Sequence, residues 1–344
     1  MAAPWTDCPT FAIDLSAPAA ERLRSFPESL ANAAAALSAA MQPDRALIPQ
    51  GIARVASARL FGRYDAEARA WGRALNEPWT DIILANCAYD FVANLFACSG
   101  VLLESPGGPV LARNMDWWPE RELARASCCL RFDHRGTPRF WIAGWPGSIG
   151  VVSGMSANGF AVALNAVLSN DRPKPIGYPT LLWLRRVVEH ARDFDHALSM
   201  LSDKSLLAPC LIAVAGRDNA QRVIIERTPN RHALRWGKPG RALVVTNDYR
   251  ALDDTRESNP DHALAATACG RFDALTEYFR GTGDAEVTDD ALLFALTDPD
   301  VMMGITAQQM LFRPAGGELR LTVPSRLLAP DATNSAGPDD IFCG

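Results

Sequence analysis

A cysteine, an arginine and an aspartate close to position 100 have the clearest potential for chemistry. Cys98 lies where an apolar, helix-like stretch changes to strand-like residues, and a turn at Gly107 and Gly108 separates it from a segment that carries Arg113 and Asp116. The turn predicts that the two segments fold back on each other and bring the three side chains together. A thiol reacts only as the thiolate, and a neighbouring guanidinium lowers the pKa of a thiol while it stays charged. The three residues therefore form a candidate nucleophilic site.

The same residues also have plainer interpretations. Cysteine is among the most buried residue types, so any one of the eight cysteines more often packs in a core than acts as a nucleophile. An Arg and an Asp beside a turn also form ordinary surface ion pairs. The surrounding sequence has to decide between these interpretations.

Motifs along most of the chain favour the nucleophile. A Cys that opens a strand and is followed by R-N-x-D, here Cys98 and residues 113–116, resembles the N-terminal nucleophile (Ntn) hydrolases of the acid ceramidase and N-acylethanolamine acid amidase group. The family's opening strand, the helix before the cut, the central hairpin and the T-N-x-Y element are similar to residues 11–15, 82–89, 149–165 and 245–249. The order of the later segments is also similar to the relatives that include choloylglycine hydrolase and isopenicillin N acyltransferase.

The resemblance implies that the chain is cut between Ala97 and Cys98. The α-amino group released on Cys98 would have a reference pKa of about 7.7 to 8.0, so it is a usable base near neutral pH. One residue would then supply both the nucleophile and the base. By resemblance, Asp116 holds this amino group and Arg113 stabilises the thiolate. Before the cut, Asp116 is the expected base.

Three further polar residues match positions of the family. By resemblance, the side-chain NH₂ of Asn247 donates to the oxyanion, although an Asn-Asp pair also suits a loop. Asn165 matches a second polar position at the end of the central hairpin, but Ala166 stands where the family has a Glu. Arg271 is similar to an Arg that heads a late helix, and a solvated charge at a helix start is an equal alternative.

Aromatic residues near this cluster indicate what the substrate carries. The candidates for substrate binding are Trp117, Trp118, Trp145 and Phe160. They would line an apolar acyl pocket, and each taken singly also fits a core aromatic. Together with the resemblance they favour an N-acyl amide with a lipophilic acyl group. The amine part stays open between an ethanolamine, an amino acid, a sphingoid base and a β-lactam nucleus.

These features predict a self-processing cysteine amidase that hydrolyses a linear amide through a thioester on Cys98, without a cofactor or a metal. One alternative keeps every residue and transfers the acyl group to an amine acceptor instead of water. Another alternative is a homologue that stays uncut and serves as a binding or structural protein.

Composition sets further bounds. The chain has 344 residues with 48% hydrophobic content, which allows one large domain or two smaller ones. A net charge of -5 and the lack of a basic stripe argue against nucleic-acid binding. The eight cysteines have neither metal-ligand spacing nor the density of a disulfide scaffold. With no secretory signal and no apolar run of about 18 residues, the expected location is the cytoplasm, without a transmembrane segment.

Local patterns predict an α+β fold. After an opening strand, helical spacing covers residues 19–41 and 52–75. From Cys98 onward, short strands bounded by Gly, Pro or Asn-Gly predominate, with helices between them. Strands grouped around helical blocks indicate a layered α+β architecture. The resemblance narrows this to the four-layer αββα sandwich of Ntn hydrolases, with two antiparallel sheets between helical layers.

The predicted cut divides one structural domain into two chains. Residues 1–97 would stay bound as a light subunit, because their strand and helices bury apolar surface. Residues 98–344 would form the catalytic subunit. Within it, residues 324–344 read as an extended tail. The oligomeric state stays open.

Overall fold

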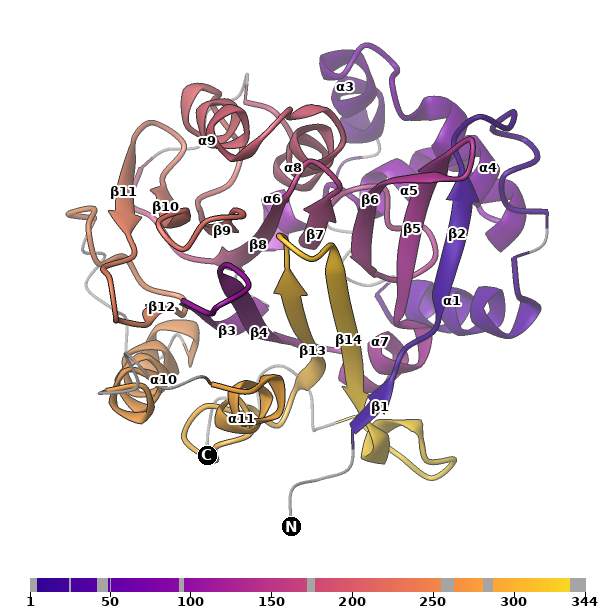
Figure 1. Cartoon of the computed structure of the whole chain (residues 1–344). Coiled ribbons are helices and arrows are strands. Elements are labelled where there is room, and N and C mark those ends of the chain that lie inside the picture. The colour runs from indigo at the N-terminus through magenta and orange to yellow at the C-terminus, as the bar shows by residue number, and fades with distance from the viewer. Residues whose placement is uncertain are drawn as a thin grey trace.

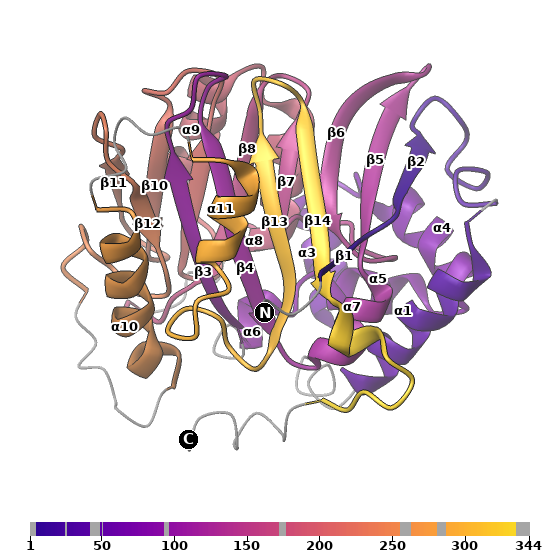
Figure 2. The ribbon, with the colours of Figure 1, turned by 60° about the horizontal axis from the view of Figure 1, so that its bottom comes forward.

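Two β-sheets face each other between layers of helices (Figures 1 and 2). The computed structural model describes residues 5–24, 26–41, 49, 51–92, 96–171, 177–254, 263–280 and 287–334. The α+β sandwich expected of an Ntn hydrolase is confirmed.

The first sheet has six strands in the order β1-β14-β13-β4-β3-β12. Their bounds are Trp5–Asp7 (β1), Glu318–Pro324 (β14), Thr306–Arg313 (β13), Val110–Trp117 (β4), Phe96–Leu103 (β3) and Leu243–Val245 (β12). Helices α10 (Ala263–Tyr278) and α11 (Asp289–Ala295) cover its outer face. Apolar residues of β3 and β4 pack there against both helices.

The second sheet has eight strands in the order β11-β10-β9-β8-β7-β6-β5-β2. Their bounds are His232–Trp236 (β11), Arg222–Arg227 (β10), Cys210–Ala215 (β9), Phe160–Ala166 (β8), Ser153–Ser156 (β7), Thr137–Gly144 (β6), Cys128–His134 (β5) and Thr10–Asp14 (β2). All its strand pairs are antiparallel except β2 with β5, which is parallel. The prediction of two antiparallel sheets needs this correction, because the chain forms the β3–β4 hairpin of the other sheet before it returns as β5.

Helices α8 (Thr180–His190) and α9 (Phe194–Asp203) pack on the second sheet. The other described helices are α1 (Glu28–Ala40), α3 (Gly51–Arg59), α4 (Asp65–Leu75), α5 (Trp79–Ala85), α6 (Tyr89–Val92) and α7 (Glu120–Ala126). None of the helices within the described residues is long and apolar enough to cross a membrane.

Three predicted boundaries are wrong. The helix predicted over 19–41 begins only at Glu28, because Pro27 lacks the backbone donor that a helix interior needs. The block predicted over 52–75 is two helices, since Phe61 and Gly62 have φ angles of 54° and 64°. The predicted tail contains a short 3₁₀ helix at Ser325–Leu328, which packs Leu327 into a small core cluster. Residues 335–344 lie outside the described residues.

The segment before Cys98 takes part in both sheets. It contributes β1 to the edge of the first sheet and β2 to the edge of the second. It also provides α4, where Glu67 accepts two hydrogen bonds, of 3.1 and 3.0 Å, from the buried Arg185 of α8. Residues on both sides of Cys98 therefore build one joint core.

Candidate active site

The β3–β4 hairpin brings Cys98 and Arg113 together. Cys98 pairs with Met115 and Gly100 pairs with Arg113, so the two side chains lie on the same face of the sheet. The Nη2 atom of Arg113 donates to the Sγ atom of Cys98. Its Nη1 atom donates to Ser153 Oγ and to the carbonyl of Leu164, both at 2.9 Å. These acceptors belong to the second sheet, so Arg113 bridges the two sheets beside the thiol.

The thiol lies in a buried, low-dielectric environment. Cys98 is only 1% exposed, and burial raises the pKa of its thiol above the ordinary value. The Arg113 guanidinium acts in the opposite direction and favours the thiolate, while the Asp116 carboxylate raises the pKa further. Because burial has the largest effect, the thiol of the intact chain is protonated near neutral pH. Its reaction therefore requires a base.

The prediction that the turn brings Asp116 as well as Arg113 beside the Cys98 thiol is wrong for Asp116. Since successive residues of a strand point to opposite faces, the Asp116 carboxylate lies on the α10 side of the sheet, away from the Cys98 thiol. Its Oδ1 atom accepts a hydrogen bond from Thr306 Oγ1. Its buried Oδ2 atom has no hydrogen-bond partner among the described residues. Burial raises the pKa of Asp116 to about 6, against the opposing influences of Arg271, Thr306 and Arg113.

Asn247 and Arg271 hold the backbone of Cys98. The Oδ1 atom of Asn247 accepts from the Cys98 N–H at 3.0 Å and from Arg271 Nη2 at 2.8 Å. The Nη1 atom of Arg271 donates to the Cys98 carbonyl at 2.7 Å and to Ser99 Oγ at 2.8 Å. Both peptide groups that flank the nucleophile are thereby fixed by side chains far away in sequence.

The alternative of a solvated helix-start charge at Arg271 is wrong. Arg271 lies in the middle of α10 and is 3% exposed. Burial lowers the pKa of its guanidinium, while Asp116 and Cys98 oppose this effect. It also does not head the helix, as its family counterpart was expected to do. A groove of about 790 Å³ between α10 and residues 299–304 includes Arg271 in its lining.

Asn165 and Asn247 connect the ends of β8 and β12. Asn165 Nδ2 donates to the Thr246 carbonyl, and Asn247 Nδ2 donates to the Ala166 carbonyl, each at 2.8 Å. Two N–H donors reach the Oδ1 atom of Asn247, which identifies this atom as the amide oxygen and the other as the NH₂ nitrogen. In the intact chain the Asn247 NH₂ group is therefore engaged with the backbone, and the predicted donation to an oxyanion would require it to release the Ala166 carbonyl first.

The aromatic candidates separate into two groups. The rings of Trp117 and Trp145 lie 5.2 Å apart and line a cavity of about 20 Å³ with Tyr89. A cavity of this size holds about one water molecule, so it excludes an acyl chain in this state. Phe160 is fully buried in the main core and does not line this cavity, and neither does Trp118.

Sequence reasoning missed three hydroxyl groups that contact the site. Ser153 accepts from Arg113, Ser99 accepts from Arg271, and Thr306 donates to Asp116. All three are fully buried. The sequence gives only a weak signal for these residues. Each is a polar residue on a strand, and a buried polar residue has to find a hydrogen-bond partner.

The cut predicted between Ala97 and Cys98 falls inside a strand. β3 begins at Phe96, two residues before the cysteine that was expected to open it. Ala97 pairs with Asp116 and is 2% exposed. The Ala97–Cys98 bond is thus held firmly beside the polar groups described above.

Comparison with known proteins places these residues in a family context. Residues 103–276, about half of the chain, match the family model described as "Acyl-coenzyme A:6-aminopenicillanic acid acyl-transferase". Arg113, Asp116, Asn165, Asn247 and Arg271 lie within the matched range, and Cys98 lies just before it.

Curated relatives agree with this match. An acid ceramidase of Balaenoptera acutorostrata scammoni is 24% identical over 194 residues, which are 48% of this chain and 47% of the relative. An N-acylethanolamine-hydrolyzing acid amidase of Rattus norvegicus is 24% identical over 185 residues, 50% of this chain and 49% of the relative. The chain thus spans about half the length of these curated relatives.

A solved structure shares the fold. It is the Caenorhabditis elegans N-acylethanolamine-hydrolyzing acid amidase (NAAA) ortholog, with a TM-score of 0.53 and 18% identity, covering 63% of this chain and 93% of that chain. The comparisons confirm the resemblance that the motifs indicated.

Proposed function

This chain belongs to the acyl-coenzyme A:6-aminopenicillanic acid acyl-transferase family, and we propose that it is a self-processing cysteine amidase that hydrolyses the linear amide bond of an N-acyl amide. The observation that carries this proposal is the buried contact between Cys98 Sγ and the Arg113 guanidinium. A guanidinium that donates to a thiol favours the thiolate, which is the form that attacks a carbonyl. The names of the relatives support amide hydrolysis.

The first reaction is the cut before Cys98. The thiol proton passes to the Asp116 carboxylate by relay through a water molecule, because this carboxylate lies on the opposite face of the sheet, and Sγ attacks the carbonyl carbon of Ala97. The Ala97–Cys98 C–N bond then breaks, and the departing nitrogen receives the proton and becomes the α-amino group of Cys98. Water hydrolyses the resulting thioester, which releases the carboxylate of Ala97 and restores the thiol.

The second reaction repeats this chemistry on a substrate. The new α-amino group accepts the thiol proton, Sγ attacks the substrate carbonyl, and the amine leaves with that proton. Water then hydrolyses the acyl thioester and frees the acid. We assign the buried Oδ2 atom of Asp116, which has no partner among the described residues, as an acceptor for the α-amino group. Arg113 stabilises the thiolate, and Asn165 and Arg271 hold the strand ends and the backbone around it.

The pH dependence of the cut tests Asp116 as its base. The pKa of Asp116 is about 6, and only the ionised carboxylate accepts a proton. The cutting rate is therefore expected to rise about tenfold per pH unit below pH 6 and to level off above it. Intact-mass measurements of the cut fraction over time give this profile.

Two variants make the pH test specific. Thr306→Val removes the donor to Asp116 Oδ1, so it raises the pKa of this carboxyl further and moves the midpoint of the profile to higher pH. Asp116→Asn removes the base and the midpoint altogether. A profile that both substitutions leave in place would exclude Asp116 as the base.

We propose that Trp117 and Trp145 line the acyl pocket once the Ala97–Cys98 bond has been cut. Trp145→Ala is then expected to favour longer acyl chains and to reduce kcat/KM about tenfold for short ones, because an emptied apolar site loses binding. Fluorogenic aminocoumarin amides from acetyl to palmitoyl measure this preference. Trp236→Ala, which changes an exposed Trp of β11, is the control. An unchanged chain-length profile in Trp145→Ala would place the acyl group elsewhere.

The family description favours acyl transfer as the second candidate function. It uses the same thioester, which is then attacked by an amine acceptor instead of water. Product analysis of an N-acyl amide reaction with and without an added amine separates the two functions. Hydrolysis yields the free acid in both cases, whereas transfer yields a new amide that depends on the added amine.

The proposal also covers the fate of the N-terminal segment and the location of the protein. Residues 1–97 stay bound as a light subunit, a role supported by their strands in both sheets and by the Glu67–Arg185 ion pair. The seven cysteines among the described residues are free thiols, which supports a reducing cytoplasmic location. The alternative is a catalytically inactive homologue that stays uncut. Intact-mass measurements decide between the two, because only the active protein forms two fragments.

A further inference from the structure

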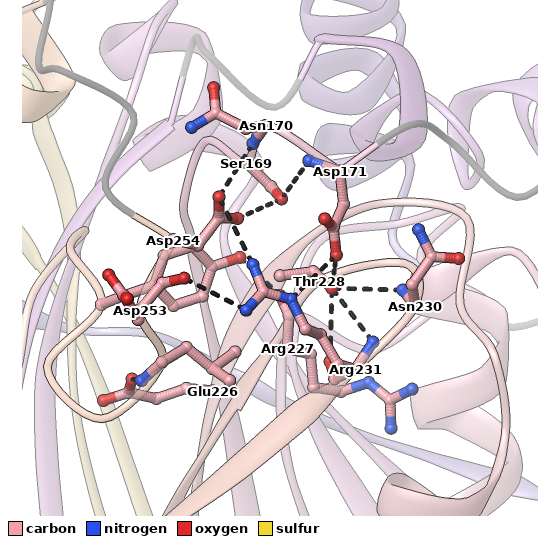
Figure 3. A network of polar contacts seen from close by, with 12 residues as sticks. Ser169, Asn170, Asp171, Glu226, Arg227, Thr228, Asn230, Arg231, Asp253 and Asp254 are labelled. Atoms are coloured by element: carbon pink, nitrogen blue, oxygen red, sulfur yellow. Dashed lines mark hydrogen bonds and ion pairs between the residues drawn. The ribbon is translucent and has the colours of Figure 1, made fainter.

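The loops that follow Asn165 and Asn247 dock on the same place, the end of β10. Asn165 lies near the end of β8 and leads into residues 167–171, and Asn247 follows β12 and leads into residues 248–254. The loop after Asn247 contacts Glu226 and Arg227. The loop after Asn165 contacts Thr228, and Figure 3 shows part of this network. The position of both asparagines thus depends on a strand that carries none of the proposed catalytic residues.

Glu226 binds the loop after Asn247 most extensively. Its Oε2 atom accepts from the backbone N–H groups of Arg250, Ala251 and Leu252, at 3.0, 2.7 and 3.0 Å. Its Oε1 atom accepts from Arg235 Nε at 3.1 Å. The side chain is fully buried, and all four of these contacts come from donors. A carboxylate suits this position because both of its oxygens accept.

A second contact ties the same loop to β10. The hydroxyl of Tyr249 donates to the carbonyl of Arg227 at 2.6 Å. Arg227 in turn donates to backbone carbonyls at the end of α9, including Ser202 at 3.1 Å. The loop is therefore attached to a strand end that a helix holds in place.

The loop after Asn165 is attached to the same framework. Asp171 accepts from Thr228 Oγ1 and from Arg231 Nε. Asp254 accepts from the Asn170 N–H at 3.2 Å and from Ser169, and so connects the two loops directly (Figure 3). The spacing between the two strand ends is fixed by this network.

We propose that Glu226 is a positioning residue that fixes Asn247 against the backbone of Cys98. Only two residues separate Asn247 from Arg250, the first residue whose N–H donates to Glu226. Release of this segment moves Asn247 Oδ1 away from the Cys98 N–H and from Arg271. This inference rests on the proposed function, in which Asn247 and Cys98 act together.

The test compares Glu226→Gln with Glu67→Gln. A glutamine has one accepting oxygen and places its NH₂ against donors, so it cannot satisfy all four contacts of Glu226. Glu226→Gln is expected to slow the cut before Cys98 by about 10- to 100-fold, because small misplacement of reacting groups has such effects. Glu67→Gln also weakens an ion pair with a buried arginine, but on α4, and is expected to cut at the rate of the unmodified protein.

A second readout separates positioning from stability. Asn247 Oδ1 contacts the backbone nitrogen of Cys98, which becomes the α-amino nitrogen after the cut, so its displacement is expected to change the pKa of this group and of the thiol beside it. The pH profile of Cys98 alkylation by iodoacetamide is expected to shift in Glu226→Gln and to stay in place in Glu67→Gln. Both profiles are recorded well below the unfolding temperature of each variant.

Tyr249→Phe keeps the proposal testable if Glu226→Gln does not fold. It removes only the hydroxyl that reaches Arg227, and it is expected to slow the cut about fivefold. A folded Glu226→Gln or Tyr249→Phe variant that cuts at the unmodified rate overturns the inference. An unmodified protein that is never cut overturns the proposed function instead, so the two failures are distinguishable.

Discussion

The Cys98→Ala variant is expected to remain one chain, whereas the unmodified protein separates into two fragments that meet between Ala97 and Cys98. A methyl group has no nucleophile and no proton to exchange, so neither the cut nor turnover of an N-acyl amide is possible. Burial raises the pKa of the thiol in the intact chain, so the cut depends on a base that accepts the thiol proton. Intact-mass spectrometry of both proteins, with time and across pH, measures the result without a substrate.

Cys269→Ala is the matched control for this experiment. Cys269 is a free, exposed thiol on α10 with contacts to Asp248 and Arg250, two residues near the site. Its variant is expected to be cut at the unmodified rate. Two fragments that also form in Cys98→Ala, or a cut at another bond, would show that the nucleophile is misassigned.

Asn247→Asp is expected to reduce kcat about 100- to 1,000-fold, the usual cost of one lost oxyanion donor. The aspartate keeps an oxygen towards the Cys98 N–H and Arg271, as Asn247 Oδ1 does. It replaces the Nδ2 donor with a second oxygen, which also faces the Ala166 carbonyl. The variant therefore changes the donor and keeps the acceptor. Steady-state hydrolysis of a fluorogenic N-acyl amide by the cut protein measures kcat and KM separately.

Asn219→Asp provides the control for the loss of an amide. Asn219 also bridges backbone groups, since its Oδ1 accepts from the Ser105 N–H and its Nδ2 donates to the Ser105 carbonyl. Its partner Ser105 follows the end of β3, whereas Cys98 lies near the start of this strand. An equal loss of kcat in both variants, or an effect of Asn247→Asp on KM alone, would contradict the role of Asn247 as an oxyanion donor.

Local sequence predicted the part of the site that one hairpin builds. The Gly-Gly turn and two apolar segments specify an antiparallel pair, and the pair places Arg113 beside Cys98, 15 positions away in the sequence. The opposite orientation of Asp116 also follows from strand alternation, once the register of β3 and β4 is known. Motif resemblance identified the other polar residues without giving their contacts.

Long-range packing decided what those contacts are. Arg271 reaches the Cys98 carbonyl across 173 residues, and Asn247 reaches its N–H across 149. The contacts of Glu226 and the closed cavity at Trp117 likewise depend on how loops and helices dock. Sequence periodicity specifies which face of a strand a residue occupies, because backbone geometry is local. Only the packing of sheet on sheet and helix on sheet decides which distant groups meet at that face, since burial forces each polar group to find a partner there.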